Sequence, residues 1–378
     1  MKKYTYIISQ SIISIFIVFN IYLGITDQWV IYKILYHNLA DLDDYKIFTN
    51  RPIVNHSKEK FDWKKSNTPV VLSSETNKLL QQLETTALLI VRNDTILLEK
   101  YYLGYDSTSI SNSFSMAKSY VSTLIGIALK QQLIKSLDQS VGEFLVEFQT
   151  QEKSKITLRN CLMMSSGLNW KEDYLNPFSS VSQAYYGDDI QKLIYKLKAT
   201  QPSGIRFEYK GSDTQILALV LEKIYQKSLS EITSEQLWTP LGAEHSGLWS
   251  LDKQNGKEKA SCCLNATARD FALLGLLYLR KGNINLTQII DSSYISISTS
   301  PINLPDKNKA TTNYYGYQWW LLPEFGNENI YYARGVGGQY IIVIPSKNVI
   351  IVRLGKKRGK KKESSFEEVF QLVNEIKK

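Results

Sequence analysis

A serine and a lysine three residues apart, Ser115 and Lys118, open a long apolar run that begins at Tyr120. At this spacing the two side chains share one face of a helix, so the amine can reach the hydroxyl. A neutral amine can take the proton from a serine oxygen, which turns that oxygen into a nucleophile for an ester or amide carbonyl. Burial and the positive end of the helix dipole both favour the neutral amine. The pair therefore predicts a serine hydrolase.

The same Ser-x-x-Lys spacing occurs three times in the chain, at Ser57/Lys60, Ser115/Lys118 and Ser250/Lys253. The first and last copies stand in polar stretches, where a lysine is solvated and keeps its proton. Only the middle copy enters a segment with apolar residues on nearly every face, which is typical of a buried helix. Residues 111–113, Ser-Asn-Ser, could cap that helix. The alternative interpretation is a capped core helix with an incidental lysine.

The charge of the chain does not indicate a nucleic-acid partner. The 378 residues carry a formal net charge of +9. Six of the positive charges form one run near the C-terminus, and no basic helix with interleaved aromatic residues is found. We interpret the run, residues 356–362, as a solvated surface and expect no binding of nucleic acid.

Cysteine and histidine are too scarce for several kinds of site. Two of the three cysteines are the neighbours Cys262 and Cys263, which make neither a disulfide framework nor a C-x-x-C metal clip, so we expect core residues. A Ser-His-Asp triad would have to use His245, and no G-x-S-x-G motif is present. We therefore expect no metal and no cofactor, and a route to the nucleophile that uses lysine.

The N-terminus has the features of a membrane segment. Lys2 and Lys3 precede an apolar stretch from Tyr6 to Ile25, about the 20 residues that a span needs. No A-x-A-like cleavage site follows, so we interpret residues 1–27 as an uncleaved signal anchor and place the rest outside the cytoplasm, in a periplasm or at the cell surface. A cleaved signal peptide and a core helix are the alternatives. Residues 28–80 are interpreted as a stalk or surface strap.

The remaining chain, 81–378, has strand patterns at both ends. Residues 86–91 and 95–102 read as one β-hairpin, and residues 339–344 and 349–354 as another, followed by an amphipathic helix near the C-terminus. Helices and loops dominate between about 132 and 285. These patterns predict an α/β fold of the α+β type: an antiparallel sheet built from both chain ends, flanked by helices, with an inserted helical subdomain and the site in the crevice between them.

Several short segments occur in the order seen in one known group of enzymes. They are Ser115–Lys118, Ile156–Leu168, Trp238–Gly242, Leu264–Ala272 and Tyr315–Trp320. With them the chain resembles the serine beta-lactamase/penicillin-binding superfamily from about residue 88 to 354. Within it, the chain most resembles the class C beta-lactamase-like hydrolases that include the nylon-oligomer (6-aminohexanoate-dimer) hydrolases. The resemblance implies a beta-lactamase/transpeptidase-like fold.

The resemblance also implies roles for three side chains. Ser115 corresponds to the acylated nucleophile and Lys118 to its proton acceptor. Tyr209 stands where the family has the tyrosine of Y-x-N, a second general base that also protonates the leaving group. A packed aromatic residue before a helix is the alternative interpretation of Tyr209.

The other implied positions surround the substrate. Tyr174 to Asn176 form a second Tyr-x-Asn triplet, but the segment instead resembles the Asp-Tyr-x-x-Pro loop whose tyrosine overhangs the substrate in the nylon-oligomer hydrolases. A packed aromatic residue is the alternative interpretation of Tyr174. Gly335 to Gly338 resembles the segment that replaces K-T-G, so the backbone N–H groups of Ser115 and Val336 would form the oxyanion hole. Gly337 and Gly338 would let a ligand approach the backbone closely, although a simple strand-entry turn is also possible.

Two departures from the family pattern bear on the substrate. Gly211 replaces the asparagine of Y-x-N, and Arg334, Gly335 and Val336 stand where a lysine or histidine is usual. Efficient beta-lactamase activity is therefore not expected, and a small-molecule or peptide-like ester or amide fits better. The sequence thus predicts a membrane-anchored serine hydrolase. The alternative is a catalytically weakened penicillin-binding-like sensor or cell-wall-binding protein.

Overall fold

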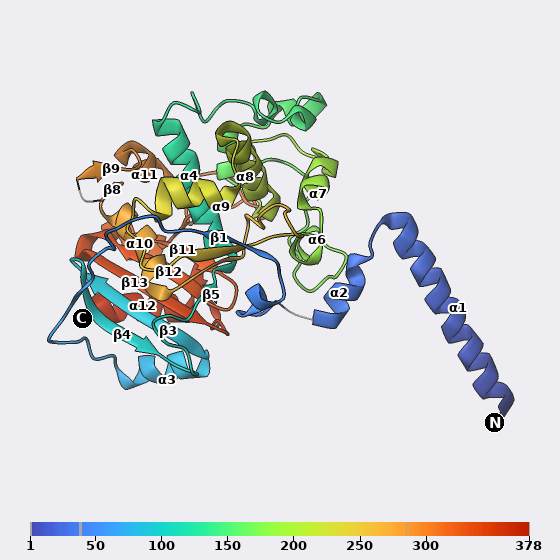
Figure 1. The fold of residues 1–378 in the computed structure, drawn as a ribbon, viewed down its shortest axis with the longest axis horizontal. Helices are drawn as coiled ribbons and strands as arrows, with labels where there is room; N and C mark the ends of the chain where they lie inside the picture. Colours follow the sequence, from blue (N-terminus) through green and yellow to red (C-terminus); the bar gives the residue numbers. More distant parts are fainter. Residues whose placement is uncertain (1, 38–39, 285, 378) are drawn as a thin grey trace.

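The centre of the molecule is a seven-stranded sheet made from both ends of the folded domain. The structure is a computed structural model that describes residues 2–37, 40–284 and 286–377; the side chains of Lys2 and Lys3, used above to orient the N-terminal segment, lie outside that description. In sheet order the strands are β10 (Trp320–Leu321), β11 (Tyr331–Gly335), β12 (Gln339–Ile344), β13 (Val349–Gly355), β3 (Thr85–Arg92), β4 (Thr95–Tyr101) and β2 (Lys64–Lys65). Figure 1 shows the red C-terminal strands beside the cyan ones.

This sheet confirms the two predicted hairpins. β3 pairs with β4 and β12 with β13, both antiparallel, and β13 pairs with β3 to join the two ends of the chain. The parallel pair of β2 with β4 at the edge is the exception to the antiparallel pattern. The predicted antiparallel sheet from both chain ends is therefore present.

The sheet is covered on both faces because its strands are apolar on both faces. In β3, Leu89 packs into a core with α4 (Ala117–Lys130), α8 (Gly211–Tyr225) and α10 (Ala268–Leu279), whereas Leu88 and Ile90 pack on the opposite side with α12 (Glu367–Lys377) and α3 (Ser74–Gln82). Successive residues of a strand point to opposite faces. The result is a three-layer arrangement with α4, the helix of the predicted nucleophile, inside the larger core.

The segment predicted to be helical also contains strands. Its helices besides α8 and α10 are α5 (Leu158–Leu162), α6 (Ser180–Tyr186), α7 (Ile190–Lys196) and α9 (Leu229–Thr233), and α11 (Ser292–Ser298) follows. A second, four-stranded sheet runs in the order β1 (Asn50–Ile53), β6 (Gly247–Ser250), β7 (Leu264–Ala266) and β5 (Ser111–Asn112). Short two-stranded pairs are β8 (Asn283–Ile284) with β9 (Thr287–Gln288), and β14 (Lys361–Lys362) with β15 (Ser365–Phe366). The strands of the second sheet are too short to leave a period in the sequence.

The N-terminal helix leaves the body of the molecule. Helix α1 (Lys2–Thr26) extends away from the domain, and α2 (Val30–His37) lies between it and α6 (Figure 1). The segment Tyr4–Thr26 is long and apolar enough to cross a membrane, and 6% of its 18-residue window is buried. Downstream, the N-terminal segment adds β1 to the second sheet and β2 to the main sheet, so it spans the surface of both.

One lysine is buried beneath this N-terminal segment. The Lys259 side chain is fully buried, its amine lies 4.5 Å from the centre of the Phe48 ring, and within the described chain it has no hydrogen-bond partner. Burial lowers the pKa of Lys259 to about 7, with Asp252 opposing the shift and Lys33 adding to it. The unfolded chain, with a normal lysine pKa, binds more protons between about pH 7 and 10. The free energy of unfolding therefore rises with pH across that range.

Replacing this lysine should stabilise the protein in a pH-dependent way. We predict that Lys259→Met raises the free energy of unfolding by about 2–5 kcal/mol at pH 6, because the cost of a buried charge is removed. The gain should shrink as the pH approaches 10, where the wild-type lysine is neutral in both states. Chemical denaturation of the full-length protein in detergent at pH 6 and pH 9.5 measures it. The exposed Lys135→Met serves as control, and an equal gain at both pH values would contradict the assignment.

Candidate active site

The nucleophile lies on a tight turn at the start of α4. Ser115 is the middle residue of a short 3₁₀ turn, η2 (Phe114–Met116), that runs directly into the helix. Phe114 has φ of 42°, a left-handed conformation that is rare for a residue with a side chain. Its N–H donates to the Asn112 carboxamide oxygen at 2.9 Å. The expectation that residues 111–113 cap the helix is wrong: Met116 stands at the N-cap without a side-chain bond, and Asn112 fixes the turn before it.

The predicted serine and lysine meet. The amine of Lys118 donates to Ser115 Oγ at 3.1 Å and to the backbone carbonyl of Ser261 at 2.7 Å. The Lys118 residue is only 3% exposed. Two acceptors fix the direction of the amine, so that it faces the hydroxyl from which it would take a proton.

The other two copies of the spacing form no such pair. Ser57 donates to the backbone carbonyl of Glu59, and Ser250 donates to the Asn50 side chain at 2.8 Å. The amine of Lys253 lies 3.8 Å from Asp189. Lys118 is buried whereas Lys60 and Lys253 are exposed, so the surroundings of the lysine, and not the spacing, separate the three copies.

Tyr209 lies beside Lys118 at the end of an aromatic cluster. The Lys118 amine is 5.1 Å from the centre of the Tyr209 ring. The Tyr209 ring packs on the Trp320 ring, with 5.4 Å between their centroids. The Arg334 guanidinium lies over the Trp320 ring, 3.3 Å from its centre. The cation of Arg334, next to the K-T-G-like segment, thus lies over an aromatic ring.

Tyr174 reaches the nucleophile, and sequence reasoning missed the residue that directs it. Its hydroxyl donates to Glu172 at 2.6 Å, and the Ser115 side chain lies close enough to oppose the rise of its pKa, although the residue keeps 47% of its surface exposed. Burial of the hydroxyl, followed by the charge of Glu172, raises the pKa of Tyr174 well above its usual value. Glu172 stands two residues before Tyr174, and that adjacency was the only signal in the sequence.

Glu172 also fastens the start of α8. Its carboxylate accepts from the backbone N–H of Gly211 at 2.9 Å and from the indole of Trp170. A Cβ on Gly211 would lie 3.2 Å from Ser261 Oγ and 3.3 Å from the Trp170 ring. Trp170 and Ser261 therefore occupy the space into which the asparagine side chain of Y-x-N would extend at position 211.

The glycine segment after β11 packs on the nucleophile turn. A Cβ on Gly335 would overlap the carbonyl oxygen of Ser113, so the backbone that leads into Val336 passes close to Ser115. Gly337 and Gly338 are left-handed, with φ of 73° and 82°. Buried Arg353 donates to the carbonyls of both glycines, at 3.1 and 2.7 Å, which holds the turn from behind. The oxyanion role of Val336 and the ligand contacts of the two glycines stay predictions.

A disulfide adjoins the carbonyl that receives Lys118. Cys263 is fully buried, as expected of a core residue, whereas Cys262 is partly exposed. The two are joined by a disulfide directly after Ser261, which was not expected. The Trp249 indole donates to the carbonyl of Cys262 at 3.0 Å. The disulfide and this hydrogen bond hold the turn that contains Ser261 in place.

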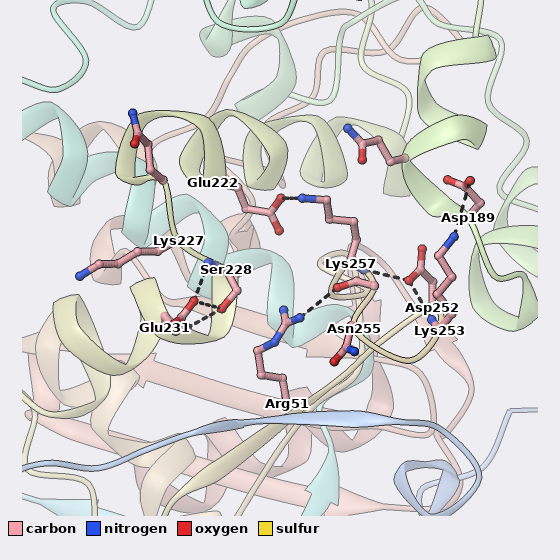
Figure 2. A pocket seen from close by; sticks show the side chains of 13 residues that line it. Arg51, Asp189, Glu222, Lys227, Ser228, Glu231, Asp252, Lys253, Asn255 and Lys257 are labelled. Atoms are coloured by element: carbon pink, nitrogen blue, oxygen red, sulfur yellow. Dashed lines mark hydrogen bonds and ion pairs between the residues drawn. The ribbon is translucent and has the colours of Figure 1, made fainter.

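A separate polar pocket of about 550 Å³ contains none of the predicted site residues. Figure 2 shows that charged side chains line it and face each other. Arg51 pairs with Glu258 at 2.6 Å, and Lys257 pairs with Glu222 at 2.5 Å. Several of its charges are thus held in ion pairs.

Comparisons with known proteins identify the family and the fold. Residues 76–372 match the Beta-lactamase family. The 6-aminohexanoate-dimer hydrolase of Paenarthrobacter ureafaciens is 25% identical over 304 residues, covering 75% of this chain and 76% of that protein.

Solved structures show the same fold. A Bacillus anthracis protein proposed to be a 6-aminohexanoate-dimer hydrolase has a TM-score of 0.74 at 22% identity, over 89% of this chain and 91% of that one. A family VIII carboxylesterase has a TM-score of 0.64 at 13% identity, over 81% and 98% of the two chains. With a match over most of its length and a buried Ser-Lys pair in place, the chain belongs to the Beta-lactamase family and is a serine hydrolase of that family.

Proposed function

We propose that this protein is a membrane-anchored hydrolase that cleaves an ester or amide through an acyl-enzyme on Ser115. One observation carries the proposal: the buried amine of Lys118 donates hydrogen bonds both to Ser115 Oγ and to the backbone carbonyl of Ser261. Helix α1 supports the anchor, since it is apolar and only 6% of its 18-residue window is buried. The domain then lies outside the cytoplasm, as the N-terminal lysines predict.

The chemistry follows from the groups around Ser115. Ser115 Oγ attacks the substrate carbonyl carbon while the neutral amine of Lys118 takes the hydroxyl proton. The N–H groups of Ser115 and Val336 stabilise the resulting oxyanion. Tyr209, beside the amine, gives its hydroxyl proton to the leaving group as the tetrahedral intermediate collapses, and Lys118 returns to Tyr209 the proton that it took from Ser115. Water then attacks the acyl-enzyme along the reverse path, releasing the acid and restoring Ser115.

The walls of the site favour an open-chain substrate. Tyr174 and Tyr209 both lie near the Ser115–Lys118 pair, and Trp320 packs on Tyr209. Arg334 lies over the Trp320 ring and replaces the lysine that usually holds a beta-lactam carboxylate. The name of the Paenarthrobacter relative points to a small amide made from 6-aminohexanoate. We therefore propose a linear ester or amide.

The nucleophile can be tested directly. We predict that Ser115→Ala lowers the turnover of p-nitrophenyl esters by about 10⁶-fold, the size of loss seen when a serine nucleophile is removed. A fluorophosphonate should add one mass increment to the wild-type protein and none to the variant, as read by intact-mass spectrometry. Ser57→Ala, from another copy of the same spacing, is the matched control and should keep full activity and labelling.

Two other outcomes would decide against the proposal. Wild type that is neither labelled nor active would exclude a serine hydrolase with this nucleophile. An acyl-enzyme that forms on Ser115 and does not turn over would instead identify a penicillin-binding-like sensor.

Glu172 should act on catalysis through Tyr174. Glutamine offers one acceptor oxygen where the carboxylate has two, so Glu172→Gln should release the Tyr174 hydroxyl. We predict that kcat/KM falls about 10-fold, which corresponds to the free energy of one hydrogen bond to a charged group. Tyr174→Phe removes the same contact. The double variant should then be about as active as Tyr174→Phe alone, measured by steady-state kinetics as a double-mutant cycle. Independent, additive losses would show that Glu172 does not work through Tyr174.

A further inference from the structure

Helix α2 folds back along the last turns of the apolar helix. The Tyr32 hydroxyl donates to the Asn20 side chain at 2.8 Å, and the backbone N–H of Gln28 donates to the carbonyl of Leu23 at 2.9 Å. Asn20 lies six residues before the end of α1, which is about 9 Å along a helix that rises 1.5 Å per residue. If α1 spans a bilayer up to Thr26, α2 therefore lies at the depth of the bilayer–water interface.

The two faces of α2 differ in what they contact. Ile31 and Ile34 are buried in a small core with Leu23 of α1 and Tyr186 of α6. The face outside this core carries the exposed side chains of Tyr32, Leu35 and Tyr36, and Trp29, the residue directly before α2, is exposed beside Tyr32. Tryptophan and tyrosine gather at the membrane interface because their rings are apolar and their tips are polar. This face has the composition of a helix that lies in the interface.

The anchor also touches the loop of the active site. The ring of Tyr22 in α1 packs edge-to-face on Phe178, with 6.3 Å between the centroids. Phe178 belongs to the loop that carries Tyr174, and the Tyr174 hydroxyl lies near Ser115. Leu175 of the same loop is strongly exposed. An ion pair between Asp27 and Lys192 of α7, at 2.9 Å, ties the end of α1 to the domain. The loop is thus held at the depth of the last turns of α1.

We infer that these residues form one membrane-facing rim and that the enzyme takes its substrate from the bilayer surface. The rim consists of Trp29, Tyr32, Leu35, Tyr36, Leu175 and Phe178. Its occupant is the lipid interface, because the rim continues directly from a helix built to span the bilayer. The substrate class is an amphiphilic ester or amide whose apolar chain stays in the membrane while its carbonyl, at headgroup depth, reaches Ser115. This inference rests on the proposed membrane-anchored hydrolase.

The position of the rim can be measured without activity. The full-length protein is placed in phosphatidylcholine vesicles that contain lipids brominated near the headgroup end of the acyl chain. Trp29 is 50% exposed, whereas the other six tryptophans are at most 9% exposed. We predict that bromine quenches tryptophan fluorescence and that Trp29→Phe abolishes the quenching. Equal fluorescence with and without bromine would overturn the inference and leave the rim to a second copy or another protein.

Substrate access is tested in the same vesicles. Rates are compared for a soluble p-nitrophenyl acetate and for a bilayer-embedded long-chain ester, 4-methylumbelliferyl palmitate. We predict that the double variant Leu175→Ser/Phe178→Ser lowers the ratio of the long-chain rate to the acetate rate at least fivefold. Each rate is divided by the amount of active enzyme, measured as the Ser115 that a fluorophosphonate labels. Leu286→Ser alters an exposed leucine in the β8–β9 turn, on the side of the molecule opposite α1 (Figure 1), and should not change the ratio.

The outcomes separate the two claims. Acetate hydrolysis with an unchanged ratio overturns membrane access and leaves the hydrolase standing. Absence of labelling and of hydrolysis with both esters overturns the proposed function itself.

Discussion

The site depends on one buried amine that has two acceptors. Lys118 is fixed between the hydroxyl of Ser115 and the carbonyl of Ser261, and each acceptor is carried by a different part of the fold. The hydroxyl is set by the turn at the start of α4, and the carbonyl by the turn before β7. The helix α4 and the second sheet must therefore be placed correctly relative to each other before the pair can work.

The surrounding structure serves that placement. Ser113 of the nucleophile turn donates from its backbone to Leu264 of β7 at 2.8 Å, which joins the two carriers directly. Gly335 lets β11 approach the same turn without a side chain in the way. Such close backbone approaches are the reason a glycine is needed at this position. The main sheet and the second sheet thus meet at Ser115.

Much of this could be predicted from the sequence where apolar periodicity is strong. The hairpins, the terminal helix and the buried helix after Ser115 were found because their patterns run for several residues. The strands of the second sheet were missed because they are two to four residues long and carry no period. Glu172 was missed because Gly211, the partner that ties it to α8, lies 39 residues away and meets it only on folding. The Cys262–Cys263 disulfide was missed because neighbouring cysteines in sequence are usually read as separate side chains.

The central claim is that Lys118 takes the proton from Ser115, and it is tested most directly by the rate at which Ser115 is acylated. Lys118→Met keeps the length of the buried stem and removes the base. Intact-mass spectrometry should follow the growth of the acyl adduct from a p-nitrophenyl ester in both proteins. We predict that acylation slows by about 10²–10⁴-fold in the variant, the usual contribution of a general base. Acylation of the variant at the wild-type rate would contradict the account.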